Sequence, residues 1–115
     1  LRKNDTAQWI FDASHRHSAC ELSLWWQGEE KIIDRTFIDK DVRWIIDYKT
    51  STPANTALPV FLHQEKETYQ EQMQGYEAIL REYDKTYGIE GIDNKLTYKK
   101  ALYFPFIAEL TLYNG

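Results

Sequence analysis

Apolar residues in the first half of the chain occur in short runs typical of strands. These runs cover residues 19–27, 31–39 and 42–50, and they are rich in aromatic and β-branched side chains. Polar or glycine-containing turns of a few residues separate them. This pattern predicts three consecutive strands joined by tight turns.

A short helix is predicted ahead of the strands, over residues 4–12. Asn4 or Asp5 can cap its start, because either side chain can accept a hydrogen bond from a free backbone N–H of the first turn. Trp9 and Ile10 are expected on its inner side. We expect this helix to pack over an edge of the sheet.

The second half of the chain changes to a helical period. A loop of small residues and prolines covers 51–59 and precedes a long amphipathic helix predicted over 65–87. Glycines follow the helix, and the aromatic run 99–110 predicts one further strand. The predicted fold is mixed α/β in the order α-β-β-β-α-β. The apolar positions that define the helix are Tyr69, Met73, Tyr76, Leu80, Tyr83 and Tyr87.

Composition suits one domain with its own core, since 43% of the 115 residues are hydrophobic and 15% are aromatic. A formal charge of -4 is opposite in sign to that of most free-standing DNA-binding proteins. The single cysteine, Cys20, excludes an internal disulfide and a four-thiolate metal site, and we expect it to be a small buried hydrophobe. With no leader and no apolar run of about 18 residues, we expect a cytoplasmic fragment of a longer polypeptide.

The candidate chemistry begins with an acid and a lysine in the third strand. Asp47 and Lys49 are two residues apart, so their side chains point to the same face of the sheet. The neighbouring apolar residues make this a buried strand, where an unpaired charge costs several kcal/mol. Two solutions are open: Asp47 forms a salt bridge with Lys49 in the core, or it shares a divalent cation with a second carboxylate.

Asp34 in the preceding strand is the predicted second carboxylate. Antiparallel pairing places it opposite Asp47 only if paired residue numbers sum to 81, which implies a two-residue turn at Lys40 and Asp41 or a four-residue loop. A three-residue loop would place the two acids on opposite faces. We predict the register that joins them, because two carboxylates suit Mg²⁺ and Lys49 would then orient a water or stabilise phosphate charge.

Several short motifs along the chain occur together in one known family. They are Glu21 in a strand, the pair Asp34-Arg35, RWIIDYKTS over 43–51, Phe61-Leu62, Gln72 with Tyr76, and ALYFP over 101–105. In this order they resemble the PD-(D/E)xK nucleases. The closest likeness is to the RecB-type domain at the C-terminus of superfamily 1 helicase-nucleases, which are UvrD/Rep-like and exonuclease V beta-like. The resemblance covers nearly the whole chain and implies a restriction-endonuclease-like fold.

The resemblance also implies roles for individual residues. Asp34 and Asp47 would hold Mg²⁺, or Mn²⁺ in its place, with the backbone carbonyl of Tyr48 completing the coordination. Lys49 would be the catalytic lysine. Many members of the family have Gly three residues before the first Asp, where this sequence has Lys31. They also carry a helical His or Glu ligand, which we expect upstream of this chain.

Three further residues have two interpretations each. By resemblance, Gln72 and Tyr76 lie against the site and touch DNA, and their spacing of four places them on one helical face. Tyr76 would serve equally well as a core aromatic. Glu21 would either support the metal site through Lys49 or a water, or be a charge on an edge strand.

The resemblance implies a magnesium-dependent DNA exonuclease or endonuclease that processes DNA ends in recombination and repair. Its partners would be DNA, helicase motor domains in the same polypeptide, and other subunits of a helicase-nuclease complex, with no membrane involved. ATP would bind only to the motor. One alternative is a catalytically inactive nuclease-like module that guides DNA or docks subunits. Another is an RNA-acting or transposon-linked nuclease of the same fold.

The remaining chemically versatile residues are expected to lie outside the site. His15 and His17 fall in a polar connection without a third ligand at a useful spacing, so we expect surface or loop packing. His63 near the long helix is expected to be solvated or to cap it. Trp25 and Trp26 are adjacent in a strand and should point to opposite faces, one of them toward a neighbouring domain.

Overall fold

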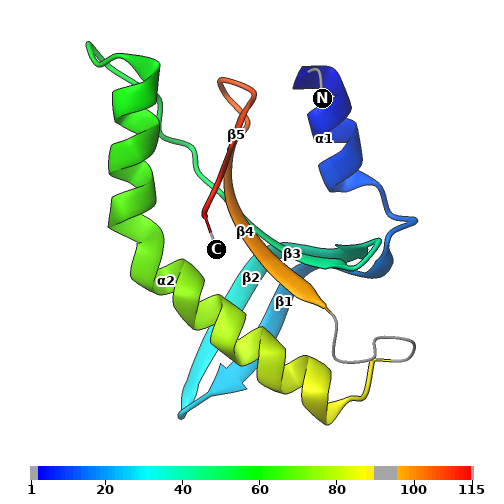
Figure 1. The fold of residues 1–115 in the computed structure, drawn as a ribbon. Coiled ribbons are helices and arrows are strands. Elements are labelled where there is room, and N and C mark those ends of the chain that lie inside the picture. Colours follow the sequence, from blue (N-terminus) through cyan, green and yellow to red (C-terminus); the bar gives the residue numbers. More distant parts are fainter. Residues whose placement is uncertain (1–2, 90–95, 115) are drawn as a thin grey trace.

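The computed structural model describes residues 3–89 and 96–114, and within these it has a five-stranded mixed sheet with a helix on each face (Figure 1). The strand order is β1-β2-β3-β4-β5, with β3 and β4 parallel and the other neighbours antiparallel. The elements are α1 (Lys3–Phe11), β1 (Arg16–Trp26), β2 (Glu29–Asp39), β3 (Val42–Tyr48), α2 (Leu58–Thr86), β4 (Thr97–Phe104) and β5 (Glu109–Leu112). The fold is mixed α/β, as predicted.

The C-terminal strand of the prediction is in fact two strands. Residues 99–110 were expected to form one strand, but the chain turns after Phe104 and returns as β5. Pro105 has no N–H to donate to a sheet, and the turn is closed by a hydrogen bond from Ile107 N to Phe104 O of 3.2 Å. Ala108 ends the turn with φ +51°. The order is therefore α-β-β-β-α-β-β.

Helix α2 begins seven residues earlier than the apolar period predicts. It starts at Leu58, because Pro59 lies in its first turn, where the fixed proline φ suits a helix and the missing N–H is not needed. The predicted stop at Gly88 is confirmed, with φ +54° just beyond the C-cap Tyr87. Tyr87 was expected on the apolar face, but it is mostly exposed. Gly91 lies outside the described residues.

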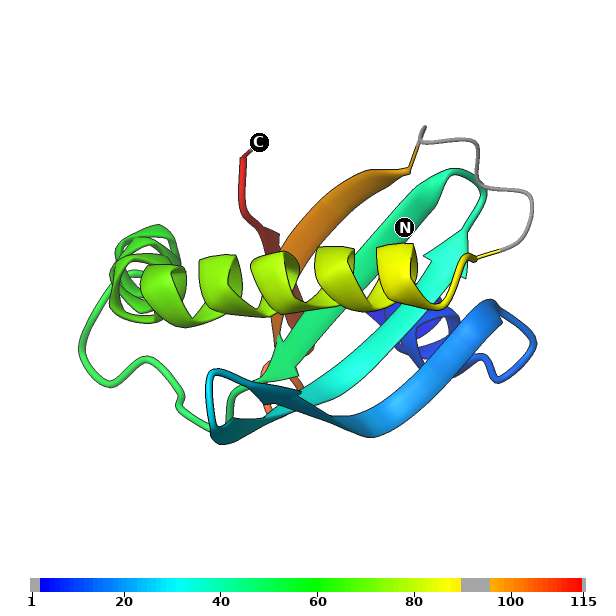
Figure 2. The same cartoon turned by 90° about the horizontal axis from the view of Figure 1, so that it is seen from below.

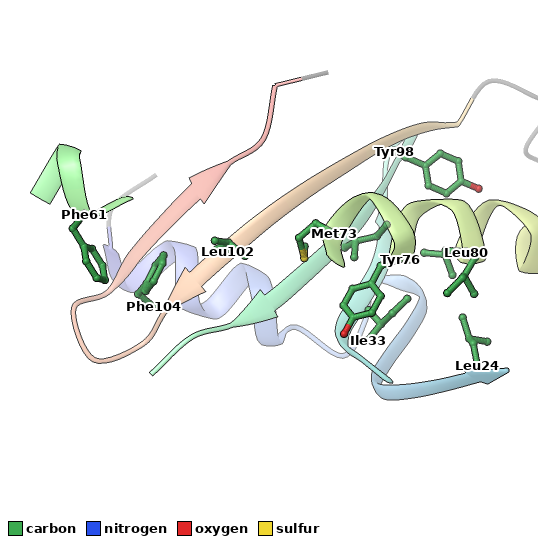
Figure 3. Packing of buried hydrophobic residues seen from close by; sticks show 11 residues of the cluster. Leu24, Ile33, Phe61, Met73, Tyr76, Leu80, Tyr98, Leu102 and Phe104 are labelled. Carbon is green, nitrogen blue, oxygen red and sulfur yellow. The ribbon is translucent and has the colours of Figure 1, made fainter. Parts of the chain in front are cut away.

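Two hydrophobic clusters cover the two faces of the sheet. Figure 2 shows the sheet between the two helices. The larger cluster joins α2 to the sheet, and Figure 3 shows Met73, Tyr76 and Leu80 of α2 turned toward it. These three are buried as their spacing predicted. Other members come from every strand except β5: Leu24, Ile33, Ile45, Tyr98, Leu102 and Phe104, with Phe61 and Ile79 of α2.

Helix α1 packs across the middle of the other face rather than over an edge, contrary to expectation. Ile10 is fully buried in a cluster with residues of β2, β3 and β4. Trp9 makes edge-to-face contacts with Phe37 and Trp44 at centroid distances of 5.1 and 4.9 Å. Trp9 and Ile10 are the side chains predicted to face inward, so the prediction of the inner side of the helix was correct. Only the predicted position of the helix, over an edge of the sheet, was wrong.

Helix α2 is bent in its first half, as both Figure 1 and Figure 2 show. Within this part, the hydroxyl of Thr68 donates to the carbonyl of Gln64 at 2.9 Å. A threonine hydroxyl bonded to the carbonyl four residues back is a common cause of helix bending. The rest of the helix then crosses the sheet over the strands that carry Asp34 and Asp47.

Candidate metal and catalytic site

The β2–β3 register brings the two predicted acids to one face. Arg35 pairs with Ile46 and Asp39 with Val42, so paired numbers sum to 81 and the turn contains only Lys40 and Asp41. Lys40 has φ +56°, as a tight two-residue hairpin turn requires. The predicted register is confirmed. Its continuation places Asp34 and Asp47 side by side, toward α2.

Asp47 is a buried carboxyl group with two charged neighbours. Its side chain is 5% exposed, and its Oδ2 lies 2.6 Å from Lys49 Nζ. Burial, together with the hydrogen bond and negative charge of Asp34, raises its pKa to about 6, although the hydrogen bond and charge of Lys49 act to lower it. Asp34 is held in turn by the backbone N–H of Tyr48, which donates to its Oδ2 at 2.8 Å.

The charges at this site do not balance. Two carboxylates, Asp34 and Asp47, share one cation among the described residues, Lys49, so the ionised site carries a net negative charge in a partly desolvated place. Like charges so close favour either a proton on one acid or a bound cation. Of the two open solutions, the Asp47–Lys49 salt bridge forms, and the second carboxylate that a shared cation would need lies beside it.

The donor set suits a small hard cation. Mg²⁺ is bound in proteins through one or two carboxylates and keeps several waters, so Asp34 and Asp47 supply the protein oxygens it needs. Among the described residues no group of three or more His, Cys, Asp or Glu side chains is placed to hold a metal. Within these residues, the predicted third ligand is a backbone oxygen, the carbonyl of Tyr48.

Lys49 is held by a contact that the sequence did not reveal. Its Nζ lies 3.4 Å from the ring centroid of Tyr69 on α2, which is a cation–π geometry. Tyr69 was placed only in the apolar stripe of the helix. The available signal was its position three residues before Gln72, which puts both side chains on one helical face.

Gln72 and Tyr76 lie next to the carboxylates, as the resemblance implied. The amide nitrogen of Gln72 donates to the Tyr76 hydroxyl at 2.9 Å. Tyr76 is 7% exposed, and its pKa is raised by burial and by the negative charge of Asp47. Tyr76 is therefore a core aromatic whose polar end faces the site, so its two interpretations do not exclude each other. Contact with DNA stays a prediction.

Tyr113, beyond the end of β5, also reaches the site. Burial together with the charges of Asp47 and Glu65 raises its pKa to about 12. Its hydroxyl donates to the carbonyl of Lys66 on α2 at 2.8 Å, and Glu65 accepts a hydrogen bond from Ser51. No spacing rule connects residues so far apart along the chain, so sequence reasoning missed this wall of the site.

Glu21 is not drawn into the site. It lies in the edge strand β1 with φ +51° and is exposed, although its neighbours Cys20 and Leu22 pair on either side of Asp34. Among the described residues it forms no hydrogen bond or ion pair with Asp34 or Lys49. Of its two interpretations, this geometry favours the charge on an edge strand.

Arg35 of the Asp-Arg pair serves the opposite face of the sheet. Its buried guanidinium donates to the carbonyls of Ile10 at 2.6 Å and Asp12 at 3.0 Å, at the C-terminal end of α1. A cation there complements the helix dipole and the free carbonyls. Cys20, 3.8 Å from Arg35, is exposed. The expectation that Cys20 is buried was wrong, because β1 is an edge strand.

A second buried ion pair lies near the start of β3. The guanidinium of Arg43 contacts both carboxylate oxygens of Asp84 on α2, at 2.7 and 3.2 Å, and the hydroxyl of Tyr98 donates to Asp84 at 2.6 Å. Arg43 also donates to the carbonyl of His17 at 3.0 Å. This cluster ties β1, β3, α2 and β4 together, and sequence reasoning did not identify it.

The histidines lie away from the carboxylates. His15 stacks on Phe37 at 4.1 Å, and its Nε2 is 2.7 Å from the carbonyl of Trp9, which confirms loop packing. His17 is exposed at the start of β1. His63 is exposed on α2 and pairs with Glu67.

Comparison with known protein families finds no match to this sequence, and comparison with curated proteins finds none either. In the part of the chain that the structure describes, no helix is both long and apolar enough to span a membrane. The case for a function therefore rests on the geometry of the site and on the motifs in the sequence.

Proposed function

We propose that this chain is a metal-dependent deoxyribonuclease domain with a restriction-endonuclease-like fold. The observation that supports this most is the carboxylate pair Asp34 and Asp47 on adjacent strands, with Lys49 ion-paired to Asp47. Two acids and one lysine leave a negative charge that a divalent cation would neutralise. An acid pair with a lysine on the same sheet face is the donor set that metal-assisted phosphodiester hydrolysis uses.

Each side chain has a distinct task in this proposal. A divalent cation held by Asp34 and Asp47 would supply an activated water and neutralise phosphate charge. Asp34 is kept in position by the Tyr48 N–H, which orients its carboxylate toward Asp47. Lys49 would turn from Asp47 to the phosphate, where its charge stabilises the developing negative charge. Tyr69 supplies the ring face against which the ammonium group lies before that movement.

DNA is the proposed substrate because of what borders the acids. Gln72 and Tyr76 offer an amide and a hydroxyl on the α2 side of the site. The formal charge of -4 argues against strong DNA binding by this chain alone. We therefore propose that it works within a RecB-type helicase-nuclease, where a motor driven by ATP holds and delivers the strand during the processing of DNA ends.

A specific observation favours the alternative of a non-catalytic module for DNA guiding or subunit docking. Lys49 already neutralises Asp47 in an ion pair of 2.6 Å, which a purely structural core strand would also show. In that case Asp34 would serve only as the acceptor of the Tyr48 N–H. The two proposals differ in whether the pair binds metal.

The test measures Mn²⁺ and Mg²⁺ binding by calorimetry and cleavage of labelled linear DNA, single-stranded and double-stranded. Asp47→Ala is compared with Asp41→Ala, which removes an exposed carboxylate from the β2–β3 turn. We expect the wild-type chain and Asp41→Ala to bind metal and cut DNA, and Asp47→Ala to do neither. If folded wild-type protein binds no divalent cation, or if Asp47→Ala cuts as fast as wild type, the nuclease proposal is wrong and the docking module replaces it.

A further inference from the structure

A pocket of about 240 Å³ lies between α2 and the β1–β2 hairpin, next to the carboxylate site. Trp26 of β1 and Lys31 of β2 form its walls on the sheet side. Its wall on α2 is formed by Glu71, Gln72, Gly75, Tyr76 and Ile79. None of the roles assigned to Asp34, Asp47 and Lys49 uses this space.

The pocket and the carboxylates share one wall. Tyr76 lines the pocket, and its hydroxyl accepts the hydrogen bond from Gln72, which lines the pocket too. The negative charges of Asp47 and Asp34 act on the same Tyr76 hydroxyl. A strand whose phosphate lies at the acids would therefore have its neighbouring nucleotide at this pocket.

Gly75, an exposed position of α2, leaves the pocket open on its helix side. Glycine in the middle of a helix destabilises it relative to alanine. A Cβ at Gly75 would meet no atom within 4 Å beyond its chain neighbours and the nearby backbone of its own helix, so packing does not require the missing side chain. What the glycine provides is open space, and that space belongs to the pocket.

The lining offers the chemistry that a nucleobase needs. Trp26 presents an indole, and aromatic rings stack on bases of any sequence. Lys31, part-buried and paired with Glu29 at 2.9 Å, can exchange that weak surface partner for a phosphate. The amide oxygen of Gln72 can accept from a base N–H. At about 240 Å³ the pocket is smaller than the 300–1,000 Å³ typical of drug-sized ligands, so it suits one planar group.

We propose that this pocket receives one unpaired nucleobase of the DNA strand, beside the phosphate that is cut. The inference rests on the proposed function, because the nuclease role makes a DNA strand the ligand. It adds a preference for single-stranded DNA. A base inside a duplex is paired and stacked, so it would first have to be extruded at an energetic cost.

The test measures binding of the whole chain to two labelled oligomers of equal length by fluorescence anisotropy. One is oligo(dT), and the other has the same sugar-phosphate backbone without bases. Binding is measured in Ca²⁺, with gels verifying that the oligomers stay intact. The key variant is Gly75→Leu, which fills the pocket, and Gln74→Leu on the exposed side of α2 is its matched control.

Wild type is expected to bind oligo(dT) more tightly than the abasic oligomer. Gly75→Leu should weaken oligo(dT) binding by about 5- to 100-fold, the range found when a base loses its stacking partner. It should leave abasic binding unchanged, and its melting temperature should be equal to or above that of wild type, since leucine favours helix. Gln74→Leu should bind both oligomers like wild type.

Two results would overturn the pocket: wild type binds both oligomers alike, or Gly75→Leu weakens both equally or neither. These results are separable from failure of the nuclease proposal. Loss of base discrimination with metal-dependent cleavage retained rejects only the pocket. Base discrimination retained in a protein that binds no divalent cation rejects the nuclease and leaves a module that holds single-stranded DNA.

Discussion

Two buried acid–base clusters lie on the same strand, β3, and only one of them is in balance. At Arg43, the guanidinium contacts both oxygens of Asp84, and Tyr98 adds a further donor. At Asp47, a single ammonium group faces two carboxylates. The first cluster satisfies its charges within the protein, and the second does not.

The difference separates a structural ion pair from a candidate binding site. A bidentate arginine–carboxylate pair meets the geometric needs of both partners, so it needs nothing from outside. Two adjacent acids with one lysine cost folding free energy at neutral pH, a cost that persists in proteins mainly where function requires it. Burial alone does not distinguish the clusters, because Asp84 and Asp47 are about equally hidden.

Breaking the balanced cluster should have the largest effect on stability. Asp84→Ala leaves the guanidinium of Arg43 buried without its counter-charge, which typically costs about 3–5 kcal/mol. Since domains of this size have only about 5–15 kcal/mol of stability, we expect a large fall in melting temperature. Urea unfolding followed by circular dichroism measures it.

The matched control removes both partners. Replacing Arg43 and Asp84 together by leucines should recover most of the loss, because no buried charge is then left unpaired. If Asp84→Ala unfolds at the wild-type urea midpoint, the cluster is not the anchor that its geometry indicates, and the comparison with Asp47 fails.

Removing one negative charge from the unbalanced site should instead lower activity and raise stability. Asp34→Asn keeps an oxygen that accepts from the Tyr48 N–H and removes the charge beside Asp47. We expect cleavage to fall by more than the roughly 10- to 100-fold that loss of a group supporting a metal ligand costs, while the metal-free protein gains about 1 kcal/mol. Cleavage rates and urea midpoints, measured on the same preparation, test the expected loss of activity and the expected gain of stability. A variant that is less stable and still active would contradict this interpretation of the site.

Proton and metal should compete for Asp47. Its pKa of about 6 exceeds the ordinary value of 3.8, so the folded, metal-free protein holds this proton more tightly than the unfolded chain does. The resulting stability is complete below about pH 4 and is lost as pH rises through about 6. Mn²⁺ must displace the proton, so its affinity should be about fourfold weaker at pH 5.5 than at pH 7.5.

The increase in melting temperature with Mn²⁺ concentration, measured at pH 5.5 and pH 7.5, gives the ratio of the two Mn²⁺ affinities. Asp41→Ala, which keeps both carboxylates of the site, is the control and should give the wild-type ratio. Equal Mn²⁺ affinity of wild type at both pH values would show that Asp47 does not exchange a proton for metal.

The smallest effect is expected at Tyr69. Tyr69→Leu removes the ring under Lys49 Nζ, a contact worth about 0.5–1 kcal/mol at a part-exposed position, so cleavage at saturating Mn²⁺ should slow by about 2- to 5-fold. Tyr69→Phe keeps the ring and should retain the wild-type rate. If the phenylalanine variant slows as much as the leucine variant, the hydroxyl matters and the cation–π contact does not.

The sequence by itself determined the central geometry of the candidate site. Alternation in a strand put Asp47 and Lys49 on one face, and the two-residue turn at Lys40 and Asp41 set the register that brings Asp34 beside them. Both rules are local, because a strand has a period of two and a tight turn permits only certain pairings. The apolar period of α2 identified Tyr76 as facing the sheet for the same reason.

Only the tertiary structure decided how these charges are balanced and what surrounds them. The contacts of Tyr113 and Tyr69 with the site, the pairing of Arg43 with Asp84, and the role of Arg35 at the end of α1 join residues that no periodicity relates. The return of the chain into β5 was likewise hidden within one apolar run. Desolvation and electrostatic balance depend on every element packed around a group, so they are set only once the whole fold is formed.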